Sequence, residues 1–143
     1  MVANPARMMI QISDRDAVLK GRKVIVIDDH ADSVEMFKLA LELCGARARA
    51  FGNADDAGAA IRIDPPDAIV SDLDIGDRDG LVRLLGIVKQ LGIPALVLTG
   101  HARQEDLARA LAAGFDDYRV KPIDPMELCR AVEKLLERRA GLA

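Results

Sequence analysis

Aromatic residues are scarce in this sequence, which has no tryptophan, one tyrosine and three phenylalanines among 143 residues. Proteins that bind single-stranded nucleic acid usually stack bases on aromatic rings beside a basic surface. The 20 lysines and arginines are outnumbered by 23 acidic residues, for a formal net charge of −3. With few rings and no basic excess, we expect no nucleic-acid partner.

Long hydrophobic runs are also missing. The longest apolar stretches, such as Val24–Ile27 and Ala95–Leu98, are far shorter than the roughly 20 residues that a membrane-spanning helix needs. The N-terminal segment MVANPARMMIQIS has no apolar core long enough for a secretory signal. We therefore expect no association with a membrane and no export.

Cysteine occurs only at Cys44 and Cys129, without CxxC spacing. Both positions fall in stretches with a helical pattern, so neither a metal site nor a disulfide framework is indicated. We expect reduced thiols in or near the core of a cytoplasmic protein.

The remaining composition is that of an ordinary globular domain, with 50% hydrophobic and 30% charged residues. A chain of this length suits a single domain. Residues 1–21 show no regular hydrophobic period and predict an N-terminal extension or linker. We place the folded domain at residues 22–139 and a short tail at 140–143.

From Lys23 onward, short apolar runs alternate with helical stretches. The runs predict strands at residues 23–27, 46–51, 67–72, 94–99 and 117–120. Apolar spacing and cap residues predict helices near residues 34–44, 54–62, 80–90 and 102–113, and a last helix from residue 125. Strands without polar alternation, separated by helices, form a parallel sheet covered on both faces. The second strand differs because Arg47 and Arg49 share one side, which suits a sheet edge. We predict an α/β fold, a doubly wound three-layer sandwich of five parallel strands and five helices.

Polar side chains stand where four of these strands end. They are Asp28 and Asp29 after the first strand, Asp72 and Asp74 at the third, Thr99 at the fourth and Lys121 after the fifth. Each alone is commonplace, since aspartate at a strand end often forms a turn or caps a helix. In a doubly wound sheet, however, the carboxyl ends of the strands share one edge, where functional crevices lie. We expect these six residues to converge there.

Carboxylates gathered within a few ångströms repel one another unless a cation neutralises them. Oxygen ligands without a nearby cysteine or histidine pair favour a hard ion, Mg2+ over Zn2+. An uncommitted carboxylate beside such an ion can attack phosphorus and become an aspartyl phosphate. Lys121 would then supply charge, and Thr99 a hydrogen bond, to the phosphoryl oxygens. The pattern indicates phosphoryl chemistry without a phosphate-binding glycine loop.

Four segments, VIVIDDH, AIVSDLDIGDRDGL, ALVLTG and DYRVKPID, occur in this order across residues 22–139. With this order and spacing, the chain resembles the response-regulator receiver domains of two-component signalling, the CheY-like superfamily. The resemblance implies a flavodoxin-like sheet with strand order 2-1-3-4-5. It also implies that Asp72 is the phosphoacceptor for a phosphohistidine on a sensor histidine kinase or a histidine phosphotransfer protein.

The resemblance implies a Mg2+ cofactor and assigns its ligands. Asp29 is implied as a direct ligand, and Asp28 as one that acts largely through water. Asp72 and the backbone carbonyl of Asp74 complete the protein's share of the ligands.

Further positions match the family's phosphoryl contacts and switch. Thr99 and Lys121 are implied to contact the phosphoryl group, with a cis peptide bond between Lys121 and Pro122. Tyr118 resembles the aromatic switch residue, which turns inward when Thr99 moves toward the phosphate. The last two helices and the fifth strand would then present a changed surface to a downstream protein partner. Whether phosphorylation also drives dimerisation stays open.

Four positions vary within the family's pattern or depart from it. Gly76 stands where many receivers carry proline, which predicts a more mobile loop after the third strand. Asp74 adds a fourth carboxylate, whose charge either slows acyl-phosphate formation or orients the hydrolytic water. His101 is expected at a solvated helix start, with a rim position that modulates dephosphorylation as the alternative. Arg119 belongs either to the output face or to solvent.

Two other protein classes share parts of the pattern. In haloacid-dehalogenase-type phosphatases, a motif like SDLDIG would make Asp72 the nucleophile and Asp74 the acid/base, but their acidic metal pair comes last in the chain. Flavodoxin-type cofactor binders need a hydroxyl- and glycine-rich loop after the first strand, where DDHADS would repel phosphate. We therefore predict a regulatory phosphoacceptor rather than an enzyme. We favour a freestanding response regulator over the terminal receiver of a hybrid sensor kinase.

Overall fold

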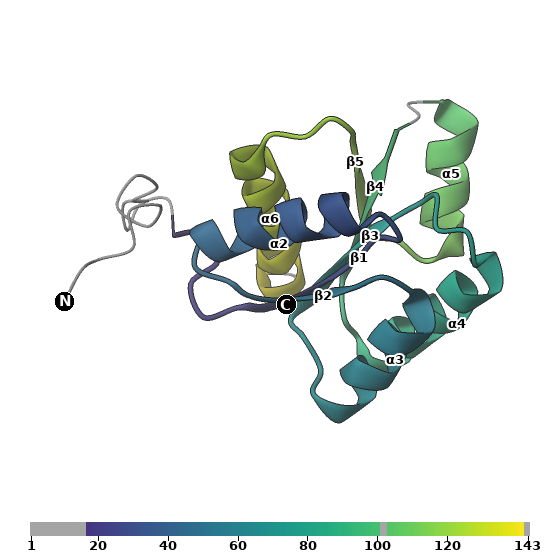
Figure 1. Cartoon of the computed structure of the whole chain (residues 1–143), viewed down its shortest axis with the longest axis horizontal. Coiled ribbons are helices and arrows are strands. Elements are labelled where there is room, and N and C mark those ends of the chain that lie inside the picture. Colours follow the sequence, from purple (N-terminus) through teal and green to yellow (C-terminus); the bar gives the residue numbers. More distant parts are fainter. Residues whose placement is uncertain (1–16, 101–102, 142–143) are drawn as a thin grey trace.

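The computed structural model describes residues 17–100 and 103–141, which alternate between strands and helices (Figure 1). In chain order the elements are β1 Lys23–Ile27, α2 Ala31–Leu43, β2 Arg47–Phe51, α3 Ala54–Ile63, β3 Ala68–Asp72, α4 Arg78–Leu91, β4 Ala95–Thr99, α5 Gln104–Ala113, β5 Asp117–Val120 and α6 Pro125–Gly141. None of the helices in these residues combines the length and the apolar character needed to cross a membrane.

The five strands form one sheet of order β2-β1-β3-β4-β5, and every neighbouring pair is parallel. This arrangement confirms the predicted α/β fold and strand order. β3 and β4 are buried along their whole length, as their continuous apolar sequences predict. β2 lies at an edge, where Arg49 donates from Nη2 to the carbonyl of Asp64 at 2.7 Å.

The sheet separates two layers of core. Helices α2 and α6 cover one face, and α3, α4 and α5 cover the other (Figure 1). Within β1, Val24 and Val26 pack toward α2 and α6, whereas Ile25 and Ile27 pack toward the opposite layer. This alternation follows from the two-residue period of a strand. β1 therefore contributes to the core on both faces of the sheet.

Both cysteines are buried and neither forms a disulfide, as predicted. Cys129 in α6 donates its Sγ hydrogen to the carbonyl of Ala40 in α2 at 3.3 Å. Burial is the main reason that the pKa of the Cys129 thiol lies far above its ordinary value, with a hydrogen bond to Cys44 as a second cause. The thiols therefore pack α6 against α2 as part of the core.

Several element limits differ from those predicted. α4 begins at Arg78 rather than Gly80, because the Asp77 side chain caps it by accepting from the Gly80 N–H at 2.9 Å. α5 is described from Gln104, and the predicted start at 102 lies outside the described residues. The last helix continues to Gly141, into the range predicted as tail.

Residues just before the predicted start of the domain also pack against it. Leu19 falls in the range predicted as an extension, yet it is fully buried among the residues of α2 and α6. Its N–H donates to the carbonyl of Cys44 at 2.9 Å, and the N–H of Gly21 donates to Gly45 at 3.1 Å. Leu19 and Gly21 are therefore held to the described fold by packing and backbone hydrogen bonds. The rest of the predicted extension, residues 1–16, lies outside the described residues.

Candidate functional site

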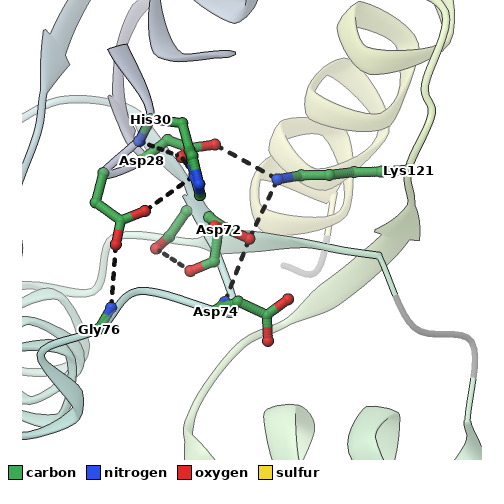
Figure 2. Close-up of polar contacts among 8 residues, drawn as sticks. Asp28, His30, Asp72, Asp74, Gly76 and Lys121 are labelled. Atoms are coloured by element: carbon green, nitrogen blue, oxygen red, sulfur yellow. Dashed lines mark hydrogen bonds and ion pairs between the residues drawn. The ribbon is translucent and has the colours of Figure 1, made fainter. Parts of the chain in front are cut away.

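Buried carboxylates and a lysine meet at the carboxyl edge of the sheet (Figure 2). Asp28 directly follows β1 and Asp72 ends β3; the two side chains are only 1% and 3% exposed. Lys121, just beyond β5, places Nζ 3.2 Å from Asp72 Oδ1 and 3.4 Å from Asp28 Oδ2. Its ammonium also lies 5.7 Å from the centroid of the Phe37 ring, within cation–π range. One ammonium is thus shared by two desolvated carboxylates.

Asp29 and His30 extend this group toward solvent. Four donor atoms, one each from Asp28, Asp29, His30 and Asp72, all lie within 4.8 Å of one another. His30 Nδ1 is 3.2 Å from Asp28 Oδ1 and 3.1 Å from Asp29 Oδ1. The convergence of the two acids and Asp72 was expected, but the participation of His30 was not. Its position next to the acid pair was the only available signal, because the ring's direction depends on its rotamer.

The loop after β3 reaches the same group through Gly76. Its N–H donates to Asp29 Oδ2 at 3.2 Å, so both oxygens of Asp29 are engaged, one by His30 and one by Gly76 (Figure 2). A proline at this position would have no N–H to donate. The sequence departure at Gly76 therefore supplies a contact to an acid of the cluster.

Asp74 lies beside the cluster without its carboxylate joining it. Its backbone N–H donates to Asp72 Oδ1 at 3.2 Å. Its exposed side chain points away from Asp28 and His30 (Figure 2) and lines a groove between α4 and α5, together with Arg78 and Arg109. The fourth carboxylate predicted near the cluster thus faces a different surface.

Thr99 and Tyr118 lie on the two neighbouring strands. Thr99 ends β4, is fully buried, and accepts the backbone N–H of Lys121 at its carbonyl at 2.8 Å. Tyr118 in β5 is half-buried against the core layer of α3, α4 and α5. The Lys121–Pro122 bond is cis. The hydrogen bond between the Lys121 N–H and the Thr99 carbonyl places these two residues directly beside each other.

Of the two remaining variable positions, Arg119 and His101, the structure describes only Arg119. Arg119 is paired, with Nη1 3.0 Å from Asp117 Oδ2 and 2.6 Å from the carbonyl of Tyr118. Arg138 of α6 binds the same Asp117 oxygen at 3.1 Å, so this network links β5 to α6. His101 lies outside the described residues.

The donor chemistry of the cluster suits a divalent cation. Asp28, Asp29 and Asp72 offer carboxylate oxygens, which hard ions such as Mg2+ prefer. Their three formal negative charges are offset by one lysine, which leaves room for a further positive charge.

The sheet order matches the CheY-like flavodoxin fold, and acids and a lysine stand at the carboxyl edge of the sheet. The chain belongs to the response regulator receiver domain family, whose model matches residues 24–133. Membership in this two-component signalling family gives the domain a regulatory role. It does not favour the phosphatase hypothesis.

Several curated proteins are similar in sequence. An uncharacterized 14.6 kDa protein in the sodA1 3'region of Leptolyngbya boryana is 37% identical over 115 residues, 78% of this chain and 87% of that protein. The transcriptional regulatory protein KdpE of Staphylococcus aureus is 33% identical over 120 residues, 84% of this chain and 51% of that protein. The chain therefore spans about half the length of KdpE but most of the Leptolyngbya protein.

Solved structures agree on the fold. A putative response regulator from Chloroflexus aurantiacus has a TM-score of 0.75 at 29% identity, covering 83% of this chain and 100% of that one. A CheY-like receiver domain protein from Methanospirillum hungatei has a TM-score of 0.76 at 24% identity. The match covers 87% of this chain and 100% of that one.

Proposed function

We propose that this domain accepts a phosphoryl group on Asp72, with Mg2+ held by Asp28, Asp29, Asp72 and the Asp74 carbonyl. The observation that carries the proposal is the ammonium of Lys121, which lies within 3.4 Å of two buried carboxylates in a receiver-family fold. Bound Mg2+ would supply positive charge to the phosphoryl oxygens.

The contacts of Asp72 distinguish its two oxygens. Oδ1 accepts from Lys121 Nζ at 3.2 Å and from the Asp74 N–H at 3.2 Å. Oδ2 receives no hydrogen bond from the described residues, which suits it to attack phosphorus. In the transfer, this oxygen forms the new O–P bond, the N–P bond of the phosphohistidine breaks, and the imidazole leaves with the bonding electrons. Lys121 and the Thr99 hydroxyl then bind the phosphoryl oxygens.

The donor that we propose is a sensor histidine kinase or a histidine phosphotransfer protein. Similarity to KdpE, named as a transcriptional regulatory protein, and membership in the receiver family support this choice. Two buried thiols that form no disulfide support a reducing compartment, and we propose the cytoplasm. The proposed role is regulatory, with no separate substrate turned over.

The proposed output is a switch on the surface formed by α5, β5 and α6. Thr99 moves toward the phosphoryl group, and Tyr118, on the adjacent strand, takes up the space that is released. A downstream protein, rather than nucleic acid, would bind this surface, in keeping with the net charge of −3.

Intact mass spectrometry tests the acceptor. Wild-type protein incubated with Mg2+ and acetyl phosphate should gain one phosphoryl group that hydroxylamine removes. Asp72→Asn and a chelated sample should gain none, while Asp74→Asn, the matched acidic control, should still be modified. Steady phosphate release with little adduct would instead support a phosphatase.

Tyr118 offers a direct test of the switch, because the chain has one tyrosine and no tryptophan. Its fluorescence should change when acetyl phosphate is added to the wild type. The change should be absent in Asp72→Asn and much smaller in Thr99→Ala. An equal change in Thr99→Ala would contradict the proposed link between Thr99 and Tyr118.

A further inference from the structure

We propose that the imidazole of His30 is an additional donor in the metal site and shifts its preference from Mg2+ toward first-row transition ions such as Co2+ and Zn2+. This inference rests on the metal site of the proposed function and concerns which ion that site selects.

The position of the ring nitrogen carries the argument. His30 Nδ1 lies 3.1 Å from Asp29 Oδ1 and 3.2 Å from Asp28 Oδ1. Two donors at right angles on one ion, with bonds of about 2.1 Å, are separated by about 3.0 Å. The spacing of nitrogen and oxygens therefore matches that of neighbouring ligands on a single ion. Figure 2 shows the His30 side chain beside Asp28, at the centre of the group of polar residues.

The local backbone explains why the ring points there. His30 is the N-cap residue of α2, and its N–H donates to Asp28 Oδ1 at 2.9 Å. Its side chain makes no capping hydrogen bond to the helix, and it is 73% exposed. The ring is therefore used neither for capping nor for core packing. Its contacts are with the acids, on the side of the cluster that a hydrated ion can reach.

Ligand chemistry gives the direction of the effect. Imidazole nitrogen is a good donor for Zn2+, Co2+ and Ni2+, whereas Mg2+ is bound by oxygen and water. A nitrogen donor should therefore strengthen binding of the transition ions much more than binding of Mg2+. The three carboxylates can still bind Mg2+, so the change is one of ion selectivity.

Calorimetric titration of tag-free protein with Co2+ and with Mg2+ measures this selectivity. The informative variant is His30→Asn, because asparagine is a favoured N-cap residue and keeps an N–H near the acids but offers no imidazole nitrogen. The ratio of the Mg2+ to the Co2+ dissociation constant should fall by roughly tenfold or more in this variant. The matched control is His101→Asn, which removes the only other histidine of the chain and should leave the ratio unchanged.

The NMR spectrum of the Co2+ form gives a second readout. Wild type and His101→Asn should show a paramagnetically shifted imidazole N–H resonance that His30→Asn lacks. An unchanged ratio in His30→Asn, or the same shifted resonance in that variant, would overturn the proposal.

Phosphorylation is measured separately with acetyl phosphate and Mg2+. A wild-type protein that selects Co2+ through His30 but forms no adduct on Asp72 would contradict the proposed function alone. If wild type and His30→Asn both form the adduct and have the same ratio of Mg2+ to Co2+ dissociation constants, only the role of His30 would be contradicted.

Discussion

The backbone N–H of Gly76 donates to Asp29 Oδ2 at 3.2 Å, joining the loop after β3 to the loop after β1. The bond spans 47 residues of sequence and ends on an acid of the metal cluster. The loop that follows the proposed acceptor is therefore tied to a carboxylate in the loop after the neighbouring strand.

Replacing Gly76 by proline removes this donor, whereas alanine keeps it. A Cβ at this position would lie 3.7 Å from Asp29 Oδ2, an ordinary contact. We expect Gly76→Pro to weaken Mg2+ binding about fivefold, from the loss of about 1 kcal/mol at an exposed bond to a charged group. Calorimetry should find Gly76→Ala close to wild type. If Gly76→Pro and Gly76→Ala weakened Mg2+ binding equally, the added side-chain volume, and not the loss of the N–H, would be the cause.

Lys121→Met leaves two buried carboxylates without their ammonium. We expect its free energy of unfolding in chelator to fall by about 2 kcal/mol, less than for a fully buried pair because Lys121 is 26% exposed. Urea denaturation measures the loss, with the exposed Lys134→Met as control. Adding Asp72→Asn should restore part of the stability. No recovery in the double variant would refute charge repulsion as the cause.

Asp74→Asn preserves the backbone N–H that binds Asp72 and removes a charge that faces the groove between α4 and α5. Since an exposed charge has a small effect, phosphorylation and dephosphorylation rates should stay within about twofold of wild type. Time-resolved mass spectrometry measures both rates. A larger change in dephosphorylation would assign the carboxylate to the hydrolytic water.

Asp55 and Arg83 join α3 to α4 through two hydrogen bonds of 3.2 and 3.0 Å. The hydrogen bond from Arg83 holds the pKa of Asp55 below its ordinary value of 3.8. The stabilisation is therefore present above that ordinary pKa and is lost as the pH falls through the lower folded pKa. Carboxyl NMR titration should show the Asp55 midpoint rising in Arg83→Gln. An unchanged midpoint would contradict the pairing.

Burial should protect Cys129 from alkylation, because its raised pKa leaves little thiolate. Iodoacetamide at pH 8 should label the native protein slowly and the urea-unfolded protein rapidly. Cys129→Ser should remain folded, since its hydroxyl can donate to the Ala40 carbonyl as the thiol does. Fast labelling of the native chain at Cys129 would show that α6 opens readily from α2.

Local patterns were sufficient to predict the strands. β1 and β5 have the predicted limits, and β3 and β4 follow largely apolar segments. The start of α4 was missed although Asp77 carries a capping signal, because aspartate in such a loop is equally typical of a turn. Leu19 was missed because a single apolar residue has no period, and its burial depends on α2 and α6 packing over it.

The candidate site was also predictable only in part. Topology brings strand ends together, so Asp28, Asp72 and Lys121 were predictable as neighbours. Side-chain direction follows from rotamers and loop geometry, which no pattern encodes. For this reason the ring of His30 and the outward carboxylate of Asp74 became evident only in the structure.

Helix α5 commits one of its ten residues, Ala110, to the core. Substitutions at its exposed positions should therefore cost little stability, whereas substitutions in β3 or β4 disturb packing on both faces. Substitutions can consequently accumulate in α5 with little change in the free energy of unfolding. The acidic cluster at the sheet edge need not change with them. Duplicated copies of such a gene can therefore diverge in the α5 surface while they keep the same acidic cluster. Each copy can then bind a different partner without a change in its phosphoryl chemistry.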